Sequence, residues 1–118
     1  MAKAGNSPRA ISSALLALAE VLLLGKDIPG ALANALQAQA IFARSGQQDS
    51  EWRAWLIAAR ASELSGNAAA TKDYAARADS LCAGLQQKWG EDAYNGYLRR
   101  ADIQTYRKDL TQILTRSR

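Results

Sequence analysis

The sequence predicts an all-α fold, and three features carry the prediction. Good helix formers, mainly alanine, leucine, glutamine and arginine, dominate the segments between turn residues. No run alternates β-branched with polar residues, which is the pattern of a half-buried strand. Only two prolines occur, Pro8 and Pro29, so few positions interrupt a helix. We therefore expect antiparallel helices joined by short turns.

The first two expected helices begin and end with the same signals. Each follows a side chain that can cap a helix N-terminus, carries a proline in its first turn, where the missing N–H leaves no bond unmade, and stops at a glycine. The expected ranges are about 8–24, capped by Ser7 and ending at Gly25, and about 28–44, capped by Asp27 and ending at Gly46.

Four more helical segments follow. Asp49 or Ser50 is expected to cap the third segment, which ends at Gly66, and Asn67 to cap the fourth. Asp102 is a good N-cap for the last one. The expected ranges are about 51–65, 68–88, 91–98 and 103–115. No linker divides them, so we expect residues 1–118 to form one domain, which is usual for a chain of this length.

The chain lacks the residues that catalytic and metal-binding sites most often use. The chain has no histidine, and Cys82 is its only cysteine. An intrachain disulfide, a cysteine zinc site and a Cys–His catalytic pair are therefore excluded. Carboxylates such as Glu63 and Asp73 are scattered singly over the expected helix surfaces. We expect no enzymatic activity, no cofactor and no metal, and a buried Cys82.

The stretch over 11–25 is apolar enough to be compared with targeting segments. Glu20 interrupts it, and no small-residue cleavage site follows where a secretory signal would need one. It is also shorter than the ~18–20 apolar residues that cross a bilayer. Together with the single cysteine, this favours a cytoplasmic protein without a membrane segment.

Small residues recur at one spacing in two of the expected helices. Ala31, Ala35 and Ala38 are spaced like Thr71, Ala75 and Ala78, at an offset of forty residues, which is typical of helical-hairpin arrays. Positions four and then three residues apart share a helix face, and small side chains there let a neighbouring helix approach closely. Larger residues are expected to face them from the partner helices, at Leu15, Leu18 and Leu22 and at Trp52, Trp55 and Ala59.

These hairpins resemble tetratricopeptide repeats (TPR). Trp55, Ala58, Ala59, Ser62 and Gly66 occupy the positions of the family pattern W-x-x-L-G-x-x-Y and its turn glycine. The first copy places Leu15, Leu18, Ala19 and Leu22 at the same positions, with leucine in place of the aromatic residue.

The repeats also depart from the family pattern. The closing proline is missing, and the period exceeds the usual ~34 residues. The resemblance implies an antiparallel helical-hairpin array of superhelical form. Its parts would be repeat one over about 8–45, repeat two over about 50–88 and a capping helical pair over about 90–116.

The resemblance implies an adaptor or scaffold that binds a peptide or a partner helix. Arg53, Leu56 and Arg60 fall on the stripe of the third helix that lines the concave surface in that family. Two arginines seven residues apart with a leucine between them are suited to an acidic peptide or a C-terminal carboxylate. The alternative for this stripe is a solvated helix face. Two repeats form a small surface, which is compatible with an oligomer or with a structural segment of a larger regulator.

A basic helical nucleic-acid-binding domain is the second functional hypothesis. The formal net charge is +4, and basic residues gather toward the C-terminus at Arg99 and Arg100, Arg107 and Lys108, and Arg116 and Arg118. Tyr94, Tyr97 and Tyr106 accompany them and could stack on bases. We favour the alternative, in which the tyrosines pack on the fourth helix and the arginines face water.

Overall fold

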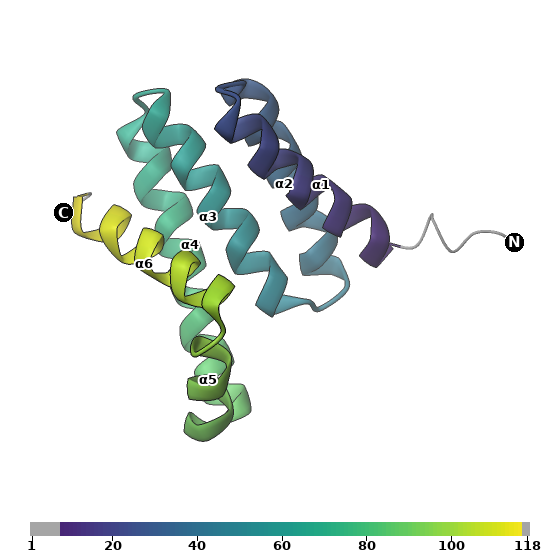
Figure 1. The fold of residues 1–118 in the computed structure, drawn as a ribbon, viewed down its shortest axis with the longest axis vertical. Helices are drawn as coiled ribbons and strands as arrows, with labels where there is room; N and C mark the ends of the chain where they lie inside the picture. Colours follow the sequence, from purple (N-terminus) through teal and green to yellow (C-terminus); the bar gives the residue numbers. More distant parts are fainter. Residues whose placement is uncertain (1–7, 117–118) are drawn as a thin grey trace, which may run out of the picture.

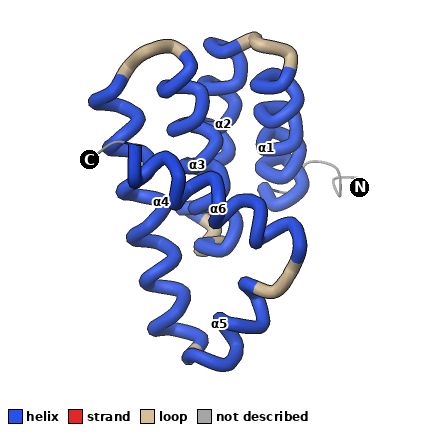
Figure 2. Tube along the Cα trace, turned by 60° about the vertical axis from the view of Figure 1, so that its left-hand side comes forward, coloured by secondary structure: helices blue, strands red, loops and turns tan. Residues whose placement is uncertain are grey.

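The computed structural model describes residues 8–116, and within that range every regular element is an α-helix (Figures 1 and 2). The all-α prediction is confirmed. None of the helices in the described range is long and apolar enough to cross a bilayer. The six helices are α1 (Pro8–Leu24), α2 (Ile28–Arg44), α3 (Gln48–Leu64), α4 (Ala68–Trp89), α5 (Glu91–Leu98) and α6 (Ala101–Arg116).

The first four helices pack in chain order, each antiparallel to the next. Contacts join α1 to α2, α2 to α3 and α3 to α4, and α1 also touches α3. The short α5 extends from the end of α4, and α6 then returns across α3 and α4 (Figures 1 and 2). The last helix therefore covers part of the face on which α1 and α3 lie, instead of only closing the end of the array.

The helix ends follow the local signals closely, with two exceptions. The Asp27 carboxylate accepts a hydrogen bond from the Gly30 N–H at 3.2 Å, and the Asn67 side chain accepts one from the Ala70 N–H at 3.1 Å, as predicted. The caps expected for α3 are wrong, because the helix begins at Gln48 and Gln47 precedes it without a side-chain cap. Both Asp49 and Ser50 therefore lie inside the first turn.

The sixth helix also begins earlier than expected. It starts at Ala101, which places Asp102 in its first turn and not at its cap. The Ser7 cap lies outside the described residues.

The three turns that join α1 to α4 have the same geometry and recur every twenty residues. Gly46 and Gly66 have φ of +73° and +82°, the left-handed region that glycine enters without strain. Lys26 holds the equivalent place in the first turn with φ of +69°. In each turn the next N–H donates to the carbonyl five residues back, as in Asp27 to Leu22 at 2.8 Å. Two helix-and-turn units make one hairpin, which accounts for the forty-residue offset of the small residues.

Small residues form the close helix contacts, as predicted. Ala31, Ala35 and Ala38 on α2, and Ala75 and Ala78 on α4, are fully buried. Thr71 is buried with them, so this part of the packing register is confirmed.

On α1 the predicted register is wrong at one position. Leu16, Ala19 and Leu23 enter the core, whereas Leu18 is 45% exposed. Leu15 and Leu22 pack at the edge of the same cluster. The apolar residues of α1 therefore cover more of its circumference than its neighbours α2 and α3 can bury.

Candidate functional site: the cleft between α1 and α6

The three residues predicted to line a peptide surface are not all accessible. Leu56 is fully buried, in the same core cluster as Ile103, Leu110 and Ile113 of α6. Its predicted place on an open surface is therefore wrong. The reason is tertiary: α4 and α6 both pack on α3, and their apolar residues share one core cluster with Leu56.

The two predicted arginines are already engaged with this protein. The Arg53 guanidinium donates to the Asp49 carbonyl at 3.3 Å and to the Ser50 hydroxyl at 3.1 Å. It also lies 5.7 Å from the centre of the Tyr106 ring. Arg60 pairs with Asp109 of α6, with 3.7 Å between Nη1 and Oδ2. Neither guanidinium is held free for a peptide carboxylate.

A cleft of about 320 Å³ lies between α1 and α6, and Arg60 of α3 contributes to its lining. Its walls differ in chemistry, because the α1 wall is largely apolar and the α6 wall is polar and acidic. The lining residues are Glu20, Leu23 and Leu24 from α1, Arg60 from α3, and Asp102, Thr105, Tyr106 and Asp109 from α6.

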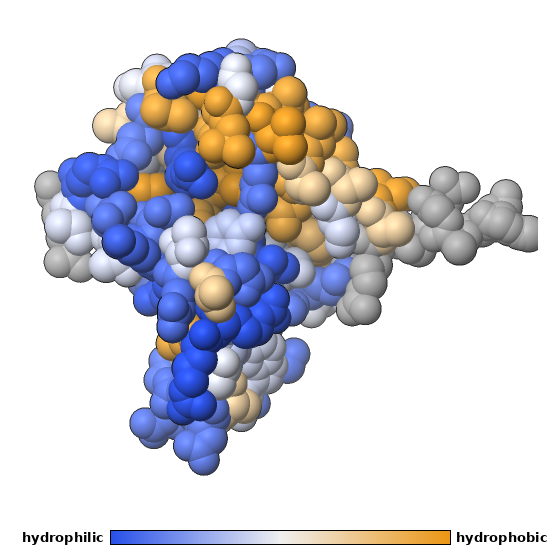
Figure 3. All heavy atoms as spheres, in the orientation of Figure 1, coloured by the Kyte–Doolittle hydropathy of each residue, from blue (hydrophilic) through white to orange (hydrophobic). Residues whose placement is uncertain are grey.

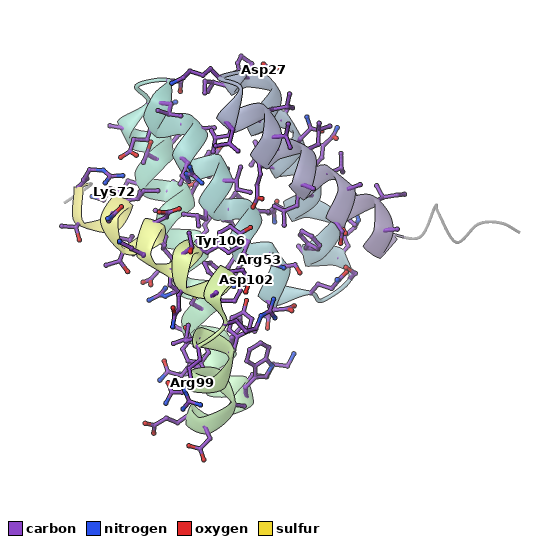
Figure 4. The ribbon with its side chains drawn as sticks, in the orientation of Figure 1. Asp27, Arg53, Lys72, Arg99, Asp102 and Tyr106 are labelled. Carbon is purple, nitrogen blue, oxygen red and sulfur yellow. The ribbon has the colours of Figure 1, made fainter. Side chains whose placement is uncertain are left out.

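One side-chain contact ties the two walls together. The Tyr106 hydroxyl donates a hydrogen bond to Oε1 of Glu20, 86 residues away in the sequence. The Tyr106 ring meets the Trp52 indole edge-on, with 6.2 Å between centroids, and Figure 4 shows Tyr106, Arg53 and Asp102 gathered where α6 begins to cross α3. This contact fixes the position of α6 relative to α1.

The Tyr106 hydroxyl keeps its proton over the whole physiological range. Burial, and then the hydrogen bond to the Glu20 carboxylate, raise the pKa of Tyr106 from 10.0 to about 12. Tyr106 is therefore a neutral donor, and it leaves the Glu20 carboxylate its negative charge.

Charged side chains of both signs meet at the cleft. Its lining holds three carboxylates, Glu20, Asp102 and Asp109, and one guanidinium, Arg60. Arg100 offsets one of them from outside the lining, since it donates to Asp102 at 2.8 Å, and this hydrogen bond holds the pKa of Asp102 below its usual value. Arg53 lies beside Tyr106 and Arg60 pairs with Asp109, so three guanidinium groups surround the three carboxylates.

An exposed apolar row of α1 reaches the cleft at one end. Leu18, Val21 and Leu24 are 45%, 63% and 78% exposed and follow one another at three-residue spacing, so they are neighbours on one helix face. Leu24 also belongs to the lining of the cleft. Figure 3 shows the apolar atoms that gather over α1 on the face that α6 crosses. Contiguous apolar surface of this kind is typical of interaction sites, whereas single exposed leucines are ordinary.

Three arginines of the basic C-terminal region form ion pairs within the molecule. Arg100 pairs with Asp102, Arg107 with Asp79 at 3.6 Å, and Arg116 with Glu63 at 2.9 Å. The accompanying tyrosines are packed. Tyr94 is buried, and the Tyr97 hydroxyl donates to the Asp49 carbonyl and accepts from the Trp52 indole N–H at 2.9 Å. These tyrosines are therefore engaged within the protein.

Cys82 is buried, as predicted, and burial raises the pKa of its thiol, so the reactive thiolate is disfavoured. Within residues 8–116, no group of three or more Cys, Asp or Glu side chains is placed to hold a metal ion.

Sequence reasoning missed the two residues that define the cleft, Glu20 and Tyr106. A signal did exist for Glu20, because it is the only charged residue between Ile11 and Leu24. Nothing in the sequence indicated that it would meet Tyr106.

No model of a known protein family matches the chain. Comparisons with curated proteins and with solved structures likewise find no match. The resemblance to tetratricopeptide repeats therefore stays a prediction.

Proposed function

We propose that this chain is a helical-repeat module that binds a partner protein through the α1–α6 cleft and the apolar row of α1. The observation that carries the proposal is the row itself, Leu18, Val21 and Leu24, which is exposed on α1 and reaches the cleft at Leu24. Buried residues of the same helix already satisfy the core, so folding alone does not explain the row. An interaction surface does.

The proposal includes a tetratricopeptide-like arrangement of the first four helices. Three turns of one geometry, two fully buried small-residue stripes and the contact between α1 and α3 all support it. In such arrays the first helices of successive hairpins share one face, which is used for recognition. Here that face has two parts: α6 occupies one, and the part next to α1 is open.

The molecule itself contains an example of a helix docked on this face. Ile103, Leu110 and Ile113 of α6 are fully buried against the array, while Gln104, Lys108 and Thr111 on the same helix are exposed. An amphipathic helix therefore fits on α3 and α4. We propose that a second helix, from the partner, lies beside α6 with its apolar side on α1.

The apolar row can contribute useful binding energy. Fully burying an exposed leucine or valine is worth about 1.5–3 kcal/mol, so covering these three partly exposed side chains gives about 3–5 kcal/mol. The loss of rigid-body freedom on association offsets part of this gain. The expected affinity is thus modest and depends on polar contacts in the cleft as well.

Selection from a displayed library of amphipathic helices tests this function. Helices that bind the protein should lose binding to the double variant Val21→Ser with Leu24→Ser. A matched control is Leu64→Ser, since Leu64 is 60% exposed and lies outside the cleft lining. Equal binding to the wild type and to the double variant would rule out the α1 row as the binding surface.

A further inference from the structure

We infer that the partner of the apolar row is a second copy of this chain, whose α1 packs antiparallel on α1; this inference rests on the proposed function and names the partner of that surface. The internal repeat supports it. Helix α3 begins and ends forty residues after α1, so each position of α1 has an equivalent on α3. On one face of the two helices, the equivalent residues differ in exposure.

This face is buried on α3 and exposed on α1. On α3 it holds four fully buried residues that share a core cluster with α1 and α2: Ala54, Ile57, Ala58 and Ala61. The equivalent residues of α1 are all exposed: Ala14, Ala17, Leu18 and Val21. The face on which α3 receives the preceding hairpin is therefore open on α1. Figure 3 shows the apolar atoms over α1 that remain uncovered.

The opposite end of the array is closed. In the first hairpin, Leu16 and Ala19 share a core cluster with α2 and α3. Their equivalents in the second hairpin, Leu56 and Ala59, share a cluster with α4 and with three residues of α6: Ile103, Leu110 and Ile113. Because α6 takes the place of a third hairpin, a second copy cannot stack its α1 on this end. Head-to-tail stacking is thereby blocked, and a twofold contact between two α1 helices remains.

The open face of α1 is complementary to itself. Four of its residues are spaced three, four and three apart, which is the seam of a coiled coil: Ile11, Ala14, Leu18 and Val21. A twofold axis at the level of Leu16 relates two antiparallel copies of this seam. Ile11 then lies opposite Val21 of the second copy, and Ala14 lies opposite its Leu18. Each pair joins a larger to a smaller side chain, so the two faces can pack closely.

The charges of α1 lie away from this seam. Glu20 is the only charged residue between Ile11 and Leu24, and its hydrogen bond to Tyr106 places it on the side of α1 that faces α6. At 3.6 residues per turn, the seam lies about 140° around the helix from Glu20. A second α1 therefore meets an uncharged face and leaves the contact between α1 and α6 intact.

The size of the contact sets its strength. A helix of 17 residues is about 25 Å long, so one face of it offers less than the ~800 Å² per partner of a standard interface. We therefore expect a weak dimer, with a Kd of about 10–100 µM.

Sedimentation equilibrium of the full chain tests the pairing. Between about 1 and 300 µM the wild type should shift from monomer toward dimer. Ala14→Glu buries a carboxylate at the seam and should weaken the dimer at least about tenfold. The control Ala83→Glu makes the same substitution on the exposed side of α4 and should change the Kd less than about twofold. A wild type that stays monomeric, or equal effects of the two variants, would overturn the inference.

Disulfide cross-linking with a mild oxidant tests the antiparallel register separately. Chains with Ala14→Cys, mixed with chains carrying Leu18→Cys, should form linked heterodimers at least about fivefold faster than a mixture of Ala14→Cys with Ala83→Cys. Cys82 is buried, so the wild type should not cross-link. Equal rates in the two mixtures would contradict the pairing.

The outcomes separate this inference from the proposed function. If the chain stays monomeric while selected helices lose binding to Val21→Ser with Leu24→Ser, the row binds a different protein and the second copy is wrong. If that double variant changes neither helix binding nor the dimer, both conclusions fail.

Discussion

Replacing Tyr106 by phenylalanine tests the contact that joins the two walls of the cleft. The change removes only the hydroxyl that bonds Glu20. The ring stays in place against Trp52 and Arg53, so packing is conserved. Glu20 then keeps its charge in a half-buried position without its donor.

The expected cost follows from the kind of hydrogen bond that is lost. A bond to a charged group contributes about 1.5–3 kcal/mol when it is buried. Glu20 is only half-buried, so water partly replaces the lost donor. We therefore expect Tyr106→Phe to lower the free energy of unfolding by about 1–2 kcal/mol. For a domain of this size that loss lowers the melting temperature by roughly 3–8 °C.

Thermal and urea unfolding followed by circular dichroism measure this difference. Tyr74→Phe is the matched control, because the Tyr74 ring stacks on Trp55 at 5.4 Å and the change again removes only a hydroxyl. We expect the control to change stability by less than about 0.5 kcal/mol. If Tyr106→Phe is no worse than Tyr74→Phe, the Glu20 contact does not hold α6 to α1.

The same residue predicts a pH dependence. The pKa of Tyr106 is raised to about 12 in the folded chain from 10.0, so the stability it contributes is fully present below pH 10 and is lost as the pH rises toward 12. Burial also raises the pKa values of Tyr94 and Tyr97, and these groups remain in the variant. Between pH 10 and 12, the Tyr106→Phe variant should therefore lose less stability than the wild type. Parallel curves would contradict this assignment.

Three further predictions concern the fold and are read by urea unfolding. Ala78→Arg should lower the free energy of unfolding by at least about 3 kcal/mol, because Ala78 is fully buried at a helix contact. The control Ala83→Arg, on the exposed side of α4, should lower it by less than about 0.5 kcal/mol. Similar losses from the two variants would refute the packing register. Lys26→Gly should stabilise the fold by about 0.5–1 kcal/mol, because glycine adopts the left-handed backbone of this turn without strain. Gly66→Ala should destabilise it by about 1 kcal/mol for the converse reason. A loss of stability from Lys26→Gly would refute the shared turn geometry. Leu56→Ala should lower the free energy of unfolding by about 2–5 kcal/mol, because Leu56 is fully buried. A loss under about 1 kcal/mol would contradict the burial of this side chain.

Local signals in the sequence predicted the helices well because they act over a few residues. Asp27 and Asn67 cap helices through bonds to an N–H three residues on, so their role is visible in the sequence. The turn at Lys26 was less visible, since lysine holds a backbone conformation that glycine holds in the other two turns. The early start of α3 was missed because Gln47 makes no side-chain cap.

The site was harder to predict, because it depends on contacts between distant parts of the chain. The helical pattern correctly predicted buried small residues on α2 and α4. It gave no information on where α6 would lie, and α6 contributes to the core cluster around Leu56 and pairs with Arg60. Glu20 and Tyr106 meet only through that placement.

Paramagnetic NMR with a spin-labelled amphipathic helix tests the binding cleft most directly. The label should broaden backbone amides of residues 18–24 in α1 and 102–109 in α6, while amides of α5 and of the α3–α4 turn at Gly66 keep their intensity. The pattern should vanish with Val21→Ser and Leu24→Ser. Broadening centred on Arg99 and Lys108, or spread evenly over the surface, would contradict the account.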